Sequence, residues 1–89
     1  MSPPTLNVRA LFDAHYTSIW RLLRRLGVRA AQLDDAAQEV FWVASRKLAQ
    51  IEPGKQHAFL YGVALRVAAS ELRRSARLSE QREPELLEQ

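Results

Sequence analysis

One stretch of the sequence, residues 34–42, carries polar side chains at a spacing that matches a helix. Wound at 3.6 residues per turn, this stretch and the residues after it place five side chains on one face: Asp35, Gln38, Glu39, Trp42 and Arg46. The opposite face is apolar, as is typical of a side that packs into a core. Aromatic side chains anchor protein interfaces, so a tryptophan among carboxylates and amides indicates a surface that binds another protein.

A second set of side chains lies on one face of the helix expected from about His57 to Arg77. It combines an aromatic ring with guanidinium groups, in the order Phe59, Gly62, Arg66, Ser70, Arg73 and Arg77. The loop before it adds Lys55, Gln56 and His57. Basic groups bind phosphates and aromatic rings stack on unpaired bases, at about 1–3 kcal/mol per base. The pattern predicts nucleic-acid binding; the alternative is that Phe59 is a core residue and the arginines are only solvated.

Catalytic constellations are missing from the sequence. It contains no cysteine, and its two histidines, His15 and His57, have no cysteine or carboxylate pattern linking them as ligands. There is no Ser-His-acid spacing and no glycine-rich phosphate loop. The adjacent acids Asp34 and Asp35 would point in different directions on a helix. We therefore expect that the protein is not an enzyme and that it binds no metal ion and no cofactor.

Composition agrees with a small basic domain. Up to Arg77 the chain of 89 residues has 12 Lys or Arg and 6 Asp or Glu, whereas the remainder has one Arg and four Glu. A basic body with an acidic tail points weakly toward nucleic acid. No apolar run is long enough to cross a membrane, and the first residues lack the features of a signal peptide. The expected compartment is the cytoplasm, without membrane insertion.

Three helices are needed to position the two faces. The first is expected from about Leu6 to Leu26, after a loose arm, with Thr5 or Asn7 as its cap and Gly27 at its end. The second runs to about Gln50, with Asp34 or Asp35 as its N-cap or a first-turn acid. A Pro-Gly turn then separates it from the third helix.

The third helix, from about His57 to Arg77, has two apolar stripes and is therefore expected at the centre of a bundle. One stripe is Tyr61, Leu65, Ala68 and Leu72, and the other is Leu60, Val63 and Val67. Tyr61 is expected in the core.

The fold class predicted is all-α, a small three- to four-helix bundle over residues 1–77. Residues 78–89 are expected to be an acidic tail or the start of a linker, either frayed or forming a short extra helix.

Three pieces of sequence occur together in a recognisable order. They are Asp34-Asp35-x-x-Gln38-Glu39-Val40-Phe41, then Ala58-Phe59-Leu60-Tyr61-x-Val63-Ala64, then Leu72-Arg73-Arg74. Together they resemble conserved region 2 of bacterial sigma-70 family sigma factors, most closely the extracytoplasmic-function (ECF) type. The likeness covers about Leu11 to Arg77, which is most of the chain.

The resemblance implies a transcription initiation factor domain. Asp35, Gln38 and Glu39 would dock on the coiled coil of the largest subunit of core RNA polymerase, and Trp42 and Arg46 share that face. The loop from Gln50 to His57, Phe59 and the arginine-bearing stripe would recognise and melt the promoter −10 element and hold its non-template strand. An anti-sigma factor is a further expected partner.

The chain departs from the family pattern at several positions. Phe59 replaces the usual tryptophan, Arg66 the usual asparagine and Ser70 the usual acid. The second domain of such factors, the region 4 helix-turn-helix, is expected to be absent. These departures leave an alternative, a non-catalytic interaction module that acts as a decoy for polymerase or an anti-sigma factor and has lost specific DNA recognition. An unrelated basic helical DNA-binding protein is a third hypothesis.

Overall fold

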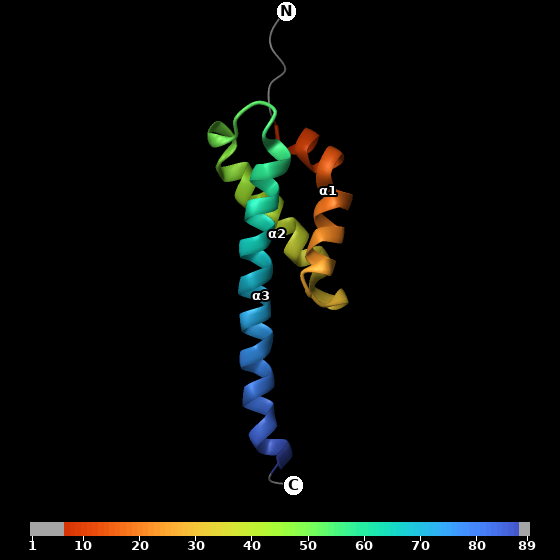
Figure 1. The fold of residues 1–89 in the computed structure, drawn as a ribbon, viewed down its shortest axis with the longest axis vertical. Coiled ribbons are helices and arrows are strands. Elements are labelled where there is room, and N and C mark those ends of the chain that lie inside the picture. Colours follow the sequence, from red (N-terminus) through yellow and green to blue (C-terminus); the bar gives the residue numbers. More distant parts are fainter. Residues whose placement is uncertain (1–6, 88–89) are drawn as a thin grey trace, which may run out of the picture.

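The computed structural model describes residues 7–87, with side chains described as far as residue 80. Figure 1 shows its three helices, α1 (Val8–Arg25), α2 (Leu33–Arg46) and α3 (Gln56–Leu87). Two short 3-10 helices, η1 (Ala30–Gln32) and η2 (Leu48–Gln50), lie before and after α2. No strand occurs among the described residues, and the predicted all-α bundle is confirmed.

Helix α1 begins two residues after the expected Leu6 and ends one residue before the expected Leu26. The Asn7 side chain accepts a hydrogen bond from the Ala10 backbone N–H at 2.8 Å, which caps the first turn. At the other end Gly27 has a φ of 102°, in the left-handed region that favours glycine. This conformation lets the Val28 N–H donate to the Leu23 carbonyl at 3.1 Å, the bond of a Schellman motif. The predicted N-terminal arm lies outside the described residues.

Helix α2 starts one residue before the predicted acids and ends four residues before the predicted Gln50. Asp34 and Asp35 both lie in its first turn, where negative charge is favourable to the helix dipole. The N-cap position is Gln32, whose side chain makes no capping hydrogen bond. Of the two roles expected for these acids, the first-turn role is therefore the one they have.

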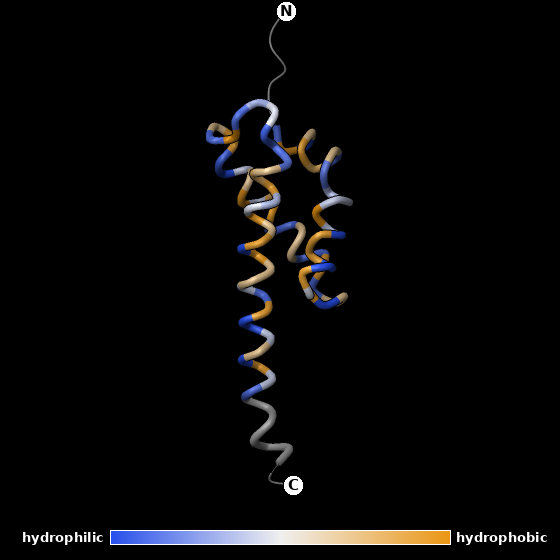
Figure 2. Tube along the Cα trace, viewed as in Figure 1, coloured by the Kyte–Doolittle hydropathy of each residue, from blue (hydrophilic) through white to orange (hydrophobic). Residues whose placement is uncertain are grey.

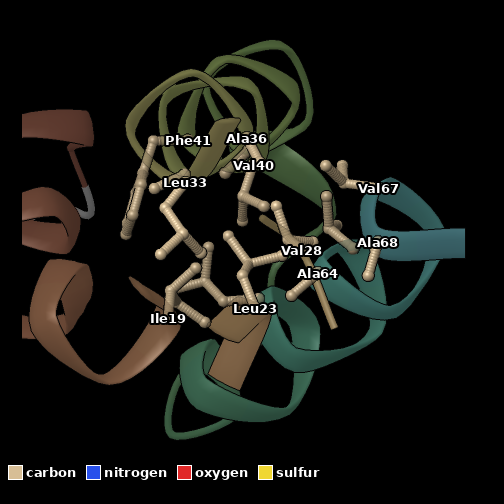
Figure 3. Close-up of a cluster of buried hydrophobic side chains, with 14 of the residues drawn as sticks. Ile19, Leu23, Val28, Leu33, Ala36, Val40, Phe41, Ala64, Val67 and Ala68 are labelled. Atoms are coloured by element: carbon tan, nitrogen blue, oxygen red, sulfur yellow. The ribbon is translucent and has the colours of Figure 1, made fainter. Parts of the chain in front are cut away.

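The hydrophobic core lies where the three helices meet (Figure 3), and all three pairs of helices are in contact. Helix α1 contributes Ile19 and Leu23, which are completely buried. Helix α2 contributes the predicted apolar face: Ala37, Val40, Phe41 and Ala44 are buried, and Leu48 beyond its end is half-buried. Helix α3 contributes Leu60, Val63, Ala64, Val67 and Ala68. The apolar face that the sequence predicts for α2 is therefore its core face.

The expected core position of one stripe on α3 is wrong. Tyr61, Leu65 and Leu72 are 44%, 41% and 41% exposed, and of that stripe only Ala68 is buried. The physical reason is that α1 and α2 both pack on one side of α3, the side of Leu60 and Val67. In the view of Figures 1 and 2 no further element of the described residues lies against α3, and these three side chains remain on its open surface.

Helix α3 is longer than the sequence predicts. It continues past the expected end at Arg77 to Leu87 as one helix of 32 residues (Figure 1). No residue from Ala69 to Glu80 is buried, so this part of α3 does not contribute to the core, although Leu72 still lies beside Gly27 at the end of α1. Within the described residues a separate fourth helix does not form. The division of the chain at Arg77 stays a prediction.

Candidate functional site

The polar face of α2 is open along its whole length. Its five predicted residues are all exposed: Asp35, Gln38, Glu39, Trp42 and Arg46. Trp42 is 58% exposed, the highest value among the large hydrophobic residues of the described part. A tryptophan held in water on an otherwise polar face has no role in the core, so its apolar surface is available to a partner.

Two neighbouring side chains on this face are held together. The Arg46 guanidinium carbon lies 4.9 Å from the centre of the Trp42 ring, a cation–π contact one helical turn apart. This contact limits the rotamers of both side chains before any partner arrives, which reduces the entropy cost of binding. Tryptophan and arginine are also the residues that most often dominate binding energy at interfaces.

The carboxylates of this face are not neutralised. Among residues 7–80, the ion pairs are Arg9–Asp13, Lys55–Glu52 and Arg74–Glu71. Asp35 and Glu39 take part in none of them, although they lie one turn apart on the same face. Their negative charge is therefore directed to solvent and is available to a basic partner surface.

The predicted basic face of α3 is also exposed, at Arg66, Ser70, Arg73 and Arg77. Arg74 pairs with Glu71 on a different line of the helix, whereas Arg66, Arg73 and Arg77 have no acidic partner among the described residues. Three free guanidinium groups along one line form a positive track suited to phosphates.

Phe59 lies at the start of this track, between two shallow depressions. Its ring is half-buried and packs against the core, so the alternative that Phe59 is a core residue is partly correct. One depression lies toward Lys55 and Gln50, and the other toward Lys47 and Arg66. The half-buried ring therefore has Lys47 and Arg66 on one side and the Lys55–Glu52 ion pair on the other, which provides a stacking surface next to phosphate-binding groups.

The loop before α3 places its residues differently. Pro53 and Gly54 form the predicted turn, in which Gly54 has a φ of 81° and the Lys55 N–H donates to the Glu52 carbonyl at 3.0 Å. Lys55 remains exposed beside Phe59, and Gln56 is half-buried in the first turn of α3.

His57 lies apart from the other predicted DNA-binding residues. Its ring centre is 5.9 Å from that of His15 on α1 and 6.5 Å from that of Tyr61. It therefore faces the α1 side of α3, and Phe59 and the basic face lie on another side. The predicted set does not form one continuous surface.

Sequence reasoning missed two residues near these faces. Lys47 borders the depression beside Phe59, because α2 ends at Arg46 and the chain turns there. Asp34 accepts hydrogen bonds from Tyr16 Oη and Trp20 Nε1, both at 3.2 Å, and joins α2 to α1. The Tyr16 and Trp20 side chains fall on adjacent turns of α1, but no sequence pattern indicates that they converge on one carboxylate.

The described residues include neither a metal-binding cluster nor a helix that could span a membrane. In this part of the chain no group of three or more His, Cys, Asp or Glu side chains is placed to hold a metal ion. None of the helices within it is both long and apolar enough to span a membrane.

A helical bundle with an acidic, tryptophan-bearing face and a separate arginine-bearing face has the composition of a domain that binds protein and nucleic acid. The family model described as Sigma-70 region 2 matches residues 11–78, well over half of the chain. The chain therefore belongs to the sigma-70 region 2 family, the domain of sigma factors that acts in transcription initiation. No curated protein and no solved structure matches it. Both faces lie within the matched residues.

Proposed function

We propose that this chain is the region 2 domain of an ECF-type sigma factor, acting in the cytoplasm, which binds core RNA polymerase and recognises the promoter −10 element. The observation that carries the proposal is the open face of α2, on which two unpaired carboxylates lie one and two turns before the Trp42–Arg46 pair. We assign polymerase docking to this face. The partner surface would be the coiled coil of the largest polymerase subunit, with cations opposite Asp35 and Glu39.

We assign DNA recognition to the surface around Phe59 and to the basic face of α3. An unpaired base of the non-template strand would stack at Phe59, while Lys47, Lys55 and Arg66 contact the flanking phosphates. Arg73 and Arg77 would continue the phosphate contacts along α3. Docking and DNA binding use different helices, so one domain can do both at once, and neither needs a catalytic group.

Charge reversal tests the docking assignment. In the variant Asp35→Arg/Glu39→Arg, binding to purified core RNA polymerase should weaken at least about tenfold, because favourable charge pairs become repulsive. The matched control Asp13→Arg/Glu80→Arg has the same change in net charge at exposed acids outside the α2 face, and should bind as the unmodified chain does. Circular dichroism checks that both variants fold. Equal loss in the two variants would contradict the assignment.

Single-stranded DNA binding tests the second assignment. Fluorescence anisotropy with a non-template −10 oligonucleotide should show weaker binding for Phe59→Leu, which keeps the packing but removes the stacking surface. Arg66→Gln should lower the slope of log affinity against log salt by about 0.7 for one lost phosphate contact. Arg29→Gln, at an exposed arginine outside both faces, is the control. Unchanged binding by both test variants would remove DNA recognition from this surface.

A decoy that binds polymerase or an anti-sigma factor without reading DNA is the second candidate. The residues Arg66 and Ser70, which stand where an amide and an acid are expected, favour it. Transcription in vitro from a melted and an unmelted −10 template separates the two: a decoy inhibits another sigma factor on both templates and initiates on neither.

A further inference from the structure

A cleft of about 250 Å³ lies between α1 and the first turns of α3, apart from both faces assigned above. Helix α1 lines it with Leu22, Arg21 and Arg25, and α3 lines it with His57 and Tyr61. Tyr61 lies roughly 140° around α3 from Arg66, because five residues separate them at 3.6 residues per turn. The cleft is therefore distinct from the basic face.

Exposed apolar side chains extend the cleft along α3. Leu65 and Leu72 fall on the same line of the helix as Tyr61, and all three are more than 40% exposed. The line spans eleven residues, or about 16 Å of helix. The core uses another side of α3, so the bundle does not require these apolar groups. Leu72 lies beside Gly27, which places the end of α1 next to the end of this line.

The edge of the cleft formed by α1 is strongly positive. Arg21, Arg24 and Arg25 are exposed, and a second depression is lined by these three residues alone. None of them has an acidic partner among the described residues. The α1 dipole accounts for a preference for positive charge here, but not for the apolar line directly alongside.

We propose that the cleft and the apolar line bind an amphipathic helix of a protein partner, with leucine-like side chains along its ridge and carboxylates along its edge. Three apolar contacts over three turns match a helix in a groove, and the free arginines select acidic flanks. Tyr61 could stack on a base, but nucleic acid fits the rest of the line less well, because Leu65 and Leu72 provide neither stacking nor hydrogen bonds for bases. Tyr61 and the arginines are of the residue types that dominate interface energy.

The proposal is tested with two designed peptides of about four helical turns, titrated into the full chain. Both carry leucine at positions i, i+4, i+7 and i+11, and their flanks are glutamate in one and lysine in the other. The glutamate peptide should bind at least about tenfold more tightly. Changes in amide chemical shift should be confined to residues 18–29 and 57–72.

Variants locate the contacts. Leu65→Gln changes an exposed residue, so the variant should fold normally. It should nevertheless bind the glutamate peptide about tenfold more weakly. Arg21→Glu/Arg25→Glu should reverse the preference, so that the lysine peptide binds more tightly. The matched control Arg73→Glu/Arg77→Glu, on the basic face, should leave the preference unchanged.

Several results would overturn the proposal. The first is that the glutamate peptide does not bind. The second is that its amide chemical-shift changes fall on the polar face of α2. The third is that Arg21→Glu/Arg25→Glu leaves the preference between the two peptides unaltered. Displacement of the bound peptide by a single-stranded oligonucleotide would assign the cleft to nucleic acid. Self-association of the chain in sedimentation that Leu65→Gln abolishes would assign it to a second copy. The assay contains neither polymerase nor promoter DNA, so its failure leaves the proposed function standing.

Discussion

Asp34 and Asp35 are neighbours in the sequence with different roles in the structure. Asp34 accepts hydrogen bonds from Tyr16 and Trp20 of α1, and so links two helices. Asp35 is turned about 100° around α2 and faces solvent with no ion pair among the described residues. One acid therefore stabilises the bundle, and the other is free for a partner.

The Tyr16 hydroxyl should report this link by its titration. Burial first, and then the charge and hydrogen bond of Asp34, raise the pKa of Tyr16 above its ordinary value of 10.0. Asp34→Asn removes the charge but not the burial, so the Tyr16 pKa should fall without losing its whole elevation. Tyrosinate absorbance in a Tyr61→Phe background, which leaves Tyr16 as the only tyrosine, measures the change.

The same shift makes stability depend on pH. Because the folded chain keeps Tyr16 protonated to a higher pH than the unfolded chain does, its contribution to the free energy of unfolding is complete below pH 10.0. The contribution is lost as the pH rises through the raised pKa. An Asp34→Asn variant with the same titration as its parent would contradict the assigned role.

At the scale of elements, the end of α1 depends on a glycine. Gly27→Ala places a Cβ on a residue with a φ of 102° and should lower the free energy of unfolding by about 1–2 kcal/mol. Gly62→Ala is the matched control, because Gly62 is in α3 with open space at its Cβ position. It should stabilise by about 0.5–1 kcal/mol. Chemical denaturation measures both, and destabilisation by both substitutions would contradict the argument.

The apolar periodicity of a helix predicts its core face only when the sequence also indicates which side the neighbouring helices will cover. Helix α2 has one apolar face, and that face is the buried one. Helix α3 has two, and the sequence cannot say which of them α1 and α2 will cover. The sequence predicts both stripes inside, but three residues of the larger stripe, Tyr61, Leu65 and Leu72, lie outside and only Ala68 is buried.

At the scale of the molecule, α3 is much longer than the bundle it helps to form. Among the side chains described, which reach Glu80, its last buried residue is Ala68, although the helix continues to Leu87. A chain ending at Arg77 should therefore have a free energy of unfolding within about 1 kcal/mol of the full chain, since residues 78–80, the described side chains that it loses, are all exposed.

The contrasting variant is Leu23→Ala, which removes a fully buried side chain from the centre of the core. It should lower the free energy of unfolding by about 2–5 kcal/mol. Thermal and urea unfolding compare the two. A large loss on truncation, comparable to that of Leu23→Ala, would show that the projecting part of α3 supports the bundle.

The sequence alone determined the helical class, the caps of α1 and the polar face of α2, because each depends on residues close together in the chain. It also determined the family, through motifs whose order and spacing are visible without coordinates. Only the tertiary structure decided which side of α3 is covered, that His57 faces α1, and that Lys47 borders Phe59. These outcomes depend on contacts between helices far apart in the sequence, and the period of a single helix contains no information about them.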